Sequence, residues 1–575
     1  KAAVQHAPEP AFGPTMLDVA VARVKDAAPR AHQVWLPPLD NRVSLDAVLT
    51  KQPPLAVPLG LIDRPAEQSR GVLTVDLSGS AGHLLIVGAA LTGKTTLLRT
   101  LICAFALTHT PLEAQFYCID FGGGGLAQLV ALPHVGGVAG RQDPERTRRT
   151  IAEVLAMLDE REARFAAAGI DSPAALRARR GHADMKGPQW ADVFLVIDNW
   201  PAVRQEFEEL EPAVLEIAAR GLGYGVHVVL TASRWNDIRA ALRESIGGRL
   251  ELRLNDPGES AVNRREAANV AAGIPGRGIT SDALHFQVAL PRIDGGVDSG
   301  AQVALEHLIE TVNGGWDGDR AKPVFVLPRM ITVSDLAQFP ITRGVPIGIS
   351  ERDLRPVSLD LAAGDQHFLV FGDGESGKTN FLRTFLLGLV KLTPARQAQI
   401  LVIDYRRTLL GVVPADYLLG YGGAEPAASA QIAETAGELT RRLPPPELSI
   451  DQLRTRSWWK GPDVYVVVDD YDLVVMPSAN PLGPLLPLLA QAKDVGLHVL
   501  LARRTGGAGR GVLEPVLMRL RELGSSGLLL SGDPQEGPLV GSVRAGPQPA
   551  GRGLLVRRRE KPALVQVAFS GPVSG

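Results

Sequence analysis

Two glycine-rich segments of the sequence have the composition of a phosphate-binding loop. GAALTGKT runs from Gly88 to Thr95 and GDGESGKT from Gly372 to Thr379, and both fit the pattern G-x-x-x-x-G-K-[ST]. Such a loop can aim several backbone N–H groups at one phosphate chain, because glycine has no Cβ to clash. The helix that follows adds the positive end of its dipole. Each segment therefore predicts a site for ATP.

Residues within the two motifs are expected to have different roles. Lys94 and Lys378 would reach the β- and γ-phosphates of ATP. The hydroxyls of Thr95 and Thr379 would bind the Mg²⁺ that accompanies ATP. The alternative, a glycine turn without a ligand, is disfavoured because the motif occurs twice with the same flanks. The predicted nucleotide-binding residues are Gly88, Ala89, Ala90, Leu91, Thr92, Gly93, Lys94, Thr95 and Thr96 in the first motif, and Gly372, Asp373, Gly374, Glu375, Ser376, Gly377, Lys378, Thr379 and Asn380 in the second.

A carboxylate ends a short apolar stretch in each half of the chain. Asp198 ends VFLVID and Asp469 ends VYVVVD. P-loop proteins hold their Mg²⁺-binding carboxylate at such a position. Asp198 and Asp469 are therefore predicted catalytic residues that bind Mg²⁺ through the nucleotide, together with Thr95 and Thr379. A polar residue that only caps a strand is the alternative.

The residue after each of these aspartates bears on turnover. Active P-loop ATPases of the motor type usually have glutamate there, placed to polarise the attacking water. The sequence has Asn199, which cannot accept a proton as a base would, and Asp470, which is one methylene shorter than glutamate. A misplacement of about 1 Å can cost about 100-fold in rate. We predict that both sites bind ATP and turn it over slowly or not at all, with the second site less impaired.

Arginines follow the next apolar stretch in each half. Arg234 stands in TASR, and Arg503 and Arg504 stand in LARR. In a motor ATPase this strand end carries a residue that senses the γ-phosphate, so Arg234 is a further candidate catalytic residue. A surface arginine near a strand end is an equally weighted alternative.

The two motifs lie in a sequence that repeats once. GHLLIVG precedes the first loop and QHFLVFG the second, and Asp120 and Asp404 each lie 26 residues after their motif lysine. His227 and His498 each lie 29 residues after the aspartate of their half. These histidines lack metal-ligand spacing and are expected to pack inside the protein. So many matches in one order predict two copies of one domain.

The repeat predicts the domain order and the fold class. Short runs of Val, Ile, Leu and Phe alternate with amphipathic segments, which predicts parallel sheets with helices on both faces. The fold class is α/β, with two tandem P-loop NTPase domains whose ligands lie at the carboxyl ends of the strands. The predicted segments are an N-terminal helix and linker at 1–56, a first ATPase domain at 57–312, a linker at 313–344 and a second ATPase domain at 345–575.

Composition narrows the function classes. Lys and Arg total 60 against 62 Asp and Glu, a formal net charge of −2, so a nucleic-acid partner is disfavoured. Hydrophobic residues make up 45% and charged residues 21%, which is typical of a folded globular chain. No apolar run approaches the length of a spanning helix. The chain opens with Lys1, and we expect it to be a fragment of a longer protein.

Further strings resemble those of the FtsK/SpoIIIE motor ATPases, and more narrowly the EccC ATPases of type VII (ESX) secretion systems. They are FYCIDFGGGGL at Phe116–Leu126, LPHVGGVAGR at Leu132–Arg141 and GYGVHVV from Gly221. The resemblance runs from about Leu17 to Leu564. It implies RecA/FtsK-like domains that correspond to the second and third of three tandem ATPase domains. In that family the later domains tend to be degenerate, which agrees with Asn199 and Asp470.

The resemblance also implies partners and a location. The cofactors would be ATP and Mg²⁺, and the last domain would recognise C-terminal signals of WXG100-type secreted substrates. Other ESX membrane-core subunits and copies of the chain itself, in a hexameric ring, would be further partners. The chain would lie in the cytoplasm at the inner face of the plasma membrane. An FtsK-like translocase of double-stranded DNA and a scaffold with relic sites are the alternatives.

Overall fold

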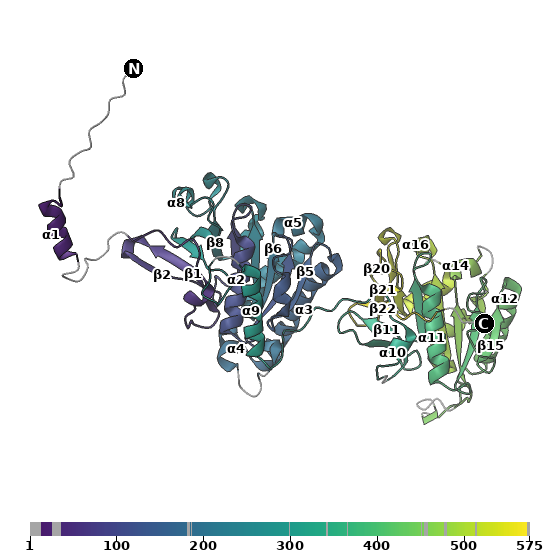
Figure 1. Ribbon diagram of the computed structural model, residues 1–575. Coiled ribbons are helices and arrows are strands. Elements are labelled where there is room, and N and C mark those ends of the chain that lie inside the picture. The colour runs from purple at the N-terminus through teal and green to yellow at the C-terminus, as the bar shows by residue number, and fades with distance from the viewer. Residues whose placement is uncertain are drawn as a thin grey trace, which may run out of the picture. The chain divides into compact units, whose positions relative to one another are not determined.

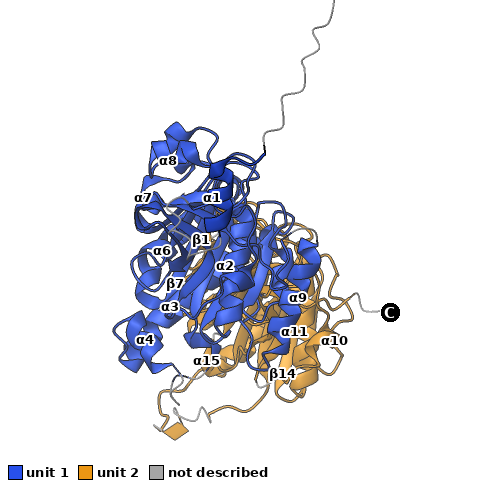
Figure 2. Cartoon of the chain, turned by 60° about the vertical axis from the view of Figure 1, so that its left-hand side comes forward, with its two compact units in different colours: residues 1–324 blue, residues 325–575 orange. Residues whose placement is uncertain are grey.

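The structure is a computed structural model and describes residues 13–25, 36–180, 185, 187–297, 300–340, 343–364, 366–449, 451–452, 458–476, 480–511 and 514–571. The chain divides into two compact units, residues 1–324 and 325–575, which Figure 2 colours separately. Each unit contains one of the two glycine-rich loops and is described here by itself.

Unit 1 is built on a ten-stranded sheet with the order β2-β1-β10-β9-β8-β3-β7-β6-β4-β5. The strands from β8 to β5 in that order are parallel, and the other pairings are antiparallel. The strands are β1 Ala56–Arg64, β2 Ser69–Asp76, β3 Leu84–Val87, β4 Ala114–Asp120, β5 Val135–Gly140, β6 Asp192–Asp198, β7 Val226–Ala232, β8 Gly248–Leu252, β9 Arg277–Thr280 and β10 His285–Val288.

Unit 2 repeats this sheet in the order β12-β11-β22-β21-β18-β13-β17-β16-β14-β15. The strands from β18 to β15 in that order are again parallel. The strands are β11 Val345–Ser350, β12 Pro356–Leu359, β13 His367–Phe371, β14 Ala398–Ile403, β15 Leu418–Gly422, β16 Asp463–Val468, β17 Leu497–Arg503, β18 Ser526–Leu529, β21 Arg552–Val556 and β22 Ala563–Val567, with a small separate pair, β19 Pro538–Val540 and β20 Val543–Arg544.

Helices cover both faces of each sheet (Figure 1). In unit 1 they are α2 Lys94–Thr108, α3 Pro144–Ala168, α4 Pro173–Arg179, α5 Trp200–Glu206, α6 Glu211–Arg220, α7 Ala240–Ser245, α8 Arg264–Asn269 and α9 Ala301–Gly314, preceded by α1 Met16–Val24. In unit 2 they are α10 Val333–Leu336, α11 Lys378–Leu392, α12 Glu425–Thr440, α14 Tyr471–Val474, α15 Ala492–Val495, α16 Ala508–Gly511 and α17 Pro515–Glu522.

The central strand of unit 1, β3, is apolar throughout because both of its faces are buried. All four residues of β3 are buried. Leu84 and Ile86 belong to the core that includes α2 and α9, whereas Leu85 and Val87 belong to the core that includes α3 and α6. A strand covered on both faces has no solvent side, so no polar alternation appears. The predicted α/β class, with mostly parallel sheets and helices on both faces, is confirmed.

In each unit, the segment before the first strand is tied to a buried arginine at the corresponding position of the repeat. The Arg277 guanidinium donates to the Leu39 carbonyl (2.9 Å), and Arg552 donates to the Leu327 carbonyl (3.0 Å). The segment at 313–344, predicted as a linker, is divided by the structure. Its residues up to Val324 belong to unit 1, and those from Phe325 belong to unit 2.

Candidate nucleotide-binding sites

Both glycine-rich loops connect a central strand to the helix that begins at the motif lysine. Gly93 and Gly377 precede α2 and α11 with φ of 100° and 109°, in the left-handed region that favours glycine. A Cβ on Gly93 would lie 2.8 Å from the backbone nitrogen of Gly276. Gly93, the second glycine of its motif, is therefore required both by its backbone angle and by the closeness of the turn at Gly276.

The motif lysines fold back onto their own loops. The Lys94 ammonium donates to the carbonyls of Gly88 (2.6 Å) and Ala89 (2.7 Å), and Lys378 donates to the Asp373 carbonyl (2.9 Å). Burial lowers the pKa of both lysines, while Asp198 beside Lys94 and Asp470 beside Lys378 act in the opposite direction. An ammonium enclosed in a loop of N–H donors, half-buried at Lys94 and buried at Lys378, is suited to a polyphosphate.

The predicted metal ligands meet in both units. The Thr95 hydroxyl donates to the Asp198 carboxylate (2.6 Å), and the Thr379 hydroxyl donates to the Asp469 carboxylate (2.7 Å). Burial raises the pKa of Asp198, and it raises that of Asp469 to about 6. A hydroxyl and a carboxylate side by side are the oxygen ligands that Mg²⁺ prefers, with the remaining positions left to phosphates and water. The donor set therefore fits Mg²⁺ that is bound together with ATP.

A threonine that the sequence analysis did not single out completes the first site. The Thr231 hydroxyl at the end of β7 donates to the second oxygen of Asp198 (2.6 Å) and accepts from the backbone N–H of Asn199 (2.7 Å). In the repeat Ala502 takes this place, and Asp469 instead accepts from the backbone N–H of Asp470 (3.0 Å). A hydroxyl three residues before the predicted Arg234 was the available signal.

A glycine loop after β4 allows the Mg²⁺ ligands of the first site to approach. Asp120 organises this loop by accepting from the backbone N–H groups of Gly122 (3.0 Å), Gly124 (3.1 Å) and Leu126 (2.7 Å). A Cβ on Gly122 would lie 2.0 Å from a carboxylate oxygen of Asp198. The carboxylate can hold its place only if this residue has no side chain.

Replacing Gly122 by alanine should therefore weaken ATP binding at the first site. The Cβ must displace the Asp198 carboxylate or the loop, a strain of about 1–3 kcal/mol, or about 5- to 150-fold in affinity. Equilibrium binding of Mg²⁺·ATP to the full chain measures the effect. Gly79→Ala is the matched control, because a Cβ there has nothing within 4 Å. An unchanged affinity in the Gly122→Ala chain would contradict this account of the loop.

Asn199 and Asp470, the residues after Asp198 and Asp469, are held in contacts that do not suit a general base. Asn199 and Asp470 have positive φ of 66° and 44°, a conformation that Asn and Asp tolerate better than longer side chains. The Asn199 amide donates to the Phe121 carbonyl (3.2 Å). An Asp470 oxygen lies 2.6 Å from Nε of Arg406. Both side chains are engaged elsewhere, which supports the prediction of slow turnover.

The arginines predicted as candidates for sensing the γ-phosphate make their contacts away from the phosphate loops. Arg234 is 60% exposed and its Nε lies 3.7 Å from a carboxylate oxygen of Glu259, so this ion pair is outside the phosphate loop. Arg503 donates to the Gly507 carbonyl (3.4 Å). In the repeat, the residue at the position of Arg234 is Thr505, whose hydroxyl bonds to the Asp373 side chain of the second loop. The structure thus brings Thr505 to the loop.

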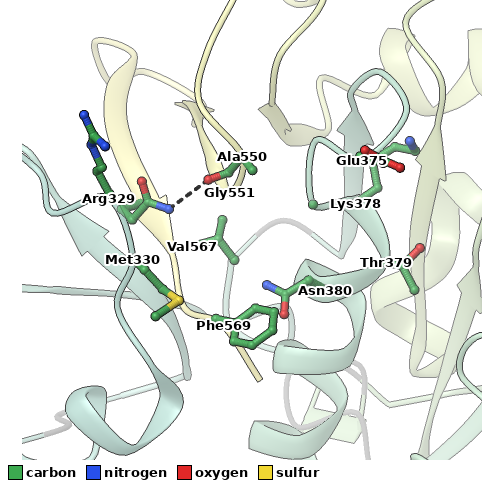
Figure 3. A pocket seen from close by; sticks show the side chains of 12 residues that line it. Arg329, Met330, Glu375, Lys378, Thr379, Asn380, Ala550, Gly551, Val567 and Phe569 are labelled. Carbon is green, nitrogen blue, oxygen red and sulfur yellow. Dashed lines mark hydrogen bonds between the residues drawn. The ribbon is translucent and has the colours of Figure 1, made fainter. Parts of the chain in front are cut away.

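A cavity of about 460 Å³ lies beside the second loop (Figure 3). Lys378, Thr379 and Asn380 line one side, and the side chains of Met330 and Phe569 line the other. The Asn380 amide donates to the Ala568 carbonyl (2.8 Å), which ties the start of α11 to the end of β22. An apolar slot continuous with a phosphate loop could hold the base and ribose of a nucleotide.

Fold and sites together define a tandem P-loop NTPase, and the comparisons specify its family. The FtsK/SpoIIIE family matches residues 45–294 and 333–417. The chain belongs to the FtsK/SpoIIIE family, in its branch of EccC ATPases of ESX secretion systems. The ESX secretion system protein EccC of Thermomonospora curvata is 46% identical over 98% of this chain, and the ESX-1 secretion system protein EccCb1 of Mycolicibacterium smegmatis is 37% identical over 96%.

Coverage of the relatives differs. The chain spans 44% of the length of the Thermomonospora curvata protein and 96% of that of EccCb1. The solved structure of Thermomonospora curvata EccC (ATPases 2 and 3) in complex with a signal sequence peptide is 46% identical, with a TM-score of 0.72 over 93% of this chain and 100% of that one. Within the described residues, no helix is both long and apolar enough to cross a membrane.

Proposed function

We propose that this chain is the ATP-binding motor and receptor portion of a type VII secretion ATPase. Its two sites bind Mg²⁺·ATP and turn it over slowly, and its last unit receives the C-terminal signal of WXG100-type substrates. The observation that carries the receptor role is a difference between the two units, on the sheet face that holds α2 in unit 1 and α11 in unit 2.

In unit 1 this face is covered by the end of the unit itself. Leu305, Leu308, Ile309 and Val312 of α9 pack into the core formed with α2. The chain after α9 then runs along the edge strand β5. The Ala321 N–H donates to the Pro133 carbonyl (2.8 Å), and the Val324 N–H donates to the Gly136 carbonyl (3.0 Å).

In unit 2, exposed apolar side chains stand at positions that adjoin α9 and the segment after it in unit 1. Leu419 on the edge strand β15 is 48% exposed, and Leu410, earlier in the chain, is 61% exposed. By strand register, Leu419 takes the position of Gly136, where a Cβ would lie 2.5 Å from the Lys322 carbonyl of the covering segment. Among the described residues of unit 2, no helix takes the place of α9.

The covering segment of unit 1 indicates what kind of occupant suits this face. An α-helix with apolar residues at i, i+3, i+4 and i+7, followed by a short extended stretch, would cover Leu410 and Leu419 and pair with the edge of β15. The solved relative bound to a signal sequence peptide supports a peptide as the occupant. A helical C-terminal signal has this chemistry.

Bound ATP is expected to act mainly as a clamp. A ligand at about 100 times its Kd stabilises the state that binds it by about 2.7 kcal/mol, and slow turnover keeps that stabilisation in place. The two relatives named above are ESX secretion proteins, which supports assembly with other ESX membrane-core subunits at the inner face of the plasma membrane. Self-association into hexamers belongs to the same proposal.

A DNA translocase is the second candidate function. The net charge of −2 and the names of the relatives do not favour it. Binding of duplex DNA that weakens steeply with salt would favour it over the secretion role.

Charges placed on the exposed face of unit 2 should remove peptide binding. We expect Leu410→Asp and Leu419→Asp each to weaken binding of a labelled C-terminal WXG100 peptide by about 10- to 100-fold, because a carboxylate must be desolvated where an apolar anchor was buried. Fluorescence anisotropy with the full chain measures the affinity. Met518→Asp is the matched control, because Met518 is similarly exposed (42%) but lies on α17. Equal affinities in all four chains would refute the receptor face.

A further inference from the structure

The two nucleotide sites differ in the loop that follows β4 in unit 1 and β14 in unit 2. In unit 1, Asp120 is followed by Phe121 and four glycines. In unit 2, Asp404 is followed by Tyr405, Arg406, Arg407 and Thr408, and the loop is one residue shorter. Both loops return to the same anchor, because the N–H of Leu126 donates to Asp120 and that of Leu409 donates to Asp404, each at 2.7 Å.

The side chains of the second loop lie against the Mg²⁺-binding side of its site. The Thr408 hydroxyl donates to the Asp469 carboxylate (3.2 Å), the same oxygen that accepts from Thr379. Nε of Arg406 lies 2.6 Å from an Asp470 oxygen. The Asp470 side chain is 12% exposed and that of Arg406 45%, so the carboxylate is enclosed while the arginine can still reach a ligand.

Asp470 lies within the field of the phosphate-binding lysine. Of the charges that raise the pKa of Lys378 against the effect of its burial, that of Asp470 is the largest. Because a P-loop lysine reaches the β- and γ-phosphates, a cation fixed on Asp470 stands near the end of the phosphate chain. In the first site the same two positions are held by Gly122 and Asn199, and neither residue carries a charge.

We propose that Arg406 is a γ-phosphate ligand of the second site, oriented by Asp470, and that it makes this site select ATP over ADP. This inference rests on the nucleotide binding proposed above. A guanidinium has five N–H donors in a planar fork, so it can stay anchored on one carboxylate while it donates to a phosphate oxygen. Asp470 then anchors a phosphate ligand, and its carboxylate is not available as a general base.

This role of Arg406 explains why the second site has both Arg406 and Asp470, where the first site has Gly122 and Asn199. An arginine without the carboxylate would be free to leave the site, and a carboxylate without the arginine would repel the γ-phosphate. The first site has neither charge, so its preference for ATP over ADP should be weaker. The second site is thereby built to retain ATP without cleaving it.

The inference is tested by binding ATP and ADP to the full chain carrying Lys94→Ala. This substitution removes nucleotide binding at the first site, so that only the second site is measured. Isothermal titration calorimetry with Mg²⁺ gives both Kd values. Arg406→Ala should weaken ATP by about 10- to 100-fold, the loss of a charge-assisted hydrogen bond, and should change ADP by less than about threefold. Arg406→Lys should keep part of the preference, because the charge remains but the fork is lost.

Arg407→Gly is the matched control. Arg407 is the exposed neighbour with φ of 60°, a conformation that glycine accepts, so this change should leave both Kd values unaltered. Equal losses for ATP and ADP in Arg406→Ala, or no loss for either, would overturn the inference. If the Lys94→Ala parent binds neither nucleotide, the proposed second nucleotide site fails and this inference falls with it. The parent's ATP binding thus distinguishes the two failures.

Discussion

Replacing Lys94 by alanine is expected to remove one of two bound ATP molecules, and replacing Lys378 the other. Lys378 is buried in its loop and Lys94 is half-buried in its own, and each ammonium is held on loop carbonyls, where it would meet the phosphates. Truncating one partner of a buried, hydrogen-bonded charge pair costs about 2–5 kcal/mol, or about 30-fold to several thousand-fold in affinity. Titration of the full chain with Mg²⁺·ATP should give a stoichiometry of two that falls to one in each variant.

Lys391→Ala is the control for a lost positive charge on α11, because this lysine lies in the last turn, away from the loop. It should keep both ATP molecules. The same preparations should show little turnover, since Asn199 and Asp470 are both engaged in other contacts. Brisk hydrolysis that one lysine variant abolishes would contradict our interpretation of the missing glutamate and would make this part of the protein a motor in its own right.

The parts of the sites that the sequence predicts are those fixed by local spacing. A P-loop motif specifies its own loop conformation, so Lys94, Thr95 and their counterparts could be assigned from the chain alone. Asp198 could be paired with Thr95 because parallel strands end at one edge of the sheet. The class of fold followed from apolar runs that leave no solvent-facing side.

The residues that the sequence did not reveal act through contacts between distant segments. Thr231 and Gly122 matter because of where they lie relative to Asp198 in the folded unit, and the sequence indicates no more of this than the closeness of Thr231 to Arg234. From the sequence alone, Arg406 is indistinguishable from a surface arginine. Only the order of the strands in the sheet places its loop beside Asp470. The covering helix α9 has an ordinary amphipathic sequence, and only comparison of the two folded units shows that unit 2 lacks its equivalent among the described residues.

Acid should destabilise unit 1 through two buried histidines. The His83 ring accepts from the Val228 N–H at Nδ1 (2.9 Å), and its Nε2 bonds to the Ala218 carbonyl (2.8 Å), an arrangement that only the neutral ring can make. Burial, with the charge of His227 as a smaller cause, lowers the pKa of His83 to about 4. Nε2 of His134 bonds to the His109 carbonyl (2.8 Å), and burial lowers its pKa to about 4 as well.

The sign of the pH effect follows from proton uptake. An unfolded histidine titrates near pH 6.5, so between pH 6.5 and 4 the unfolded chain binds protons that the folded unit refuses. The free energy of unfolding therefore falls as the pH falls, by up to about 3 kcal/mol for each of the two histidines. Above pH 6.5 both rings are neutral in both states, and neither contributes a pH dependence.

His134→Tyr should remove about half of this acid sensitivity, because the repeat already shows tyrosine in that role. Tyr417 stands at the corresponding position of unit 2, and its hydroxyl donates to the Thr393 carbonyl (2.9 Å), the counterpart of the His109 carbonyl. Urea unfolding of the full chain at pH 7 and pH 4.5, with proteolysis to assign each transition to its unit, gives the difference. His307→Tyr, on the exposed side of α9, should lose as much stability in acid as the parent. If His134→Tyr also loses as much as the parent, the protons that destabilise unit 1 are taken up at other residues, and the burial of His134 carries no cost in acid.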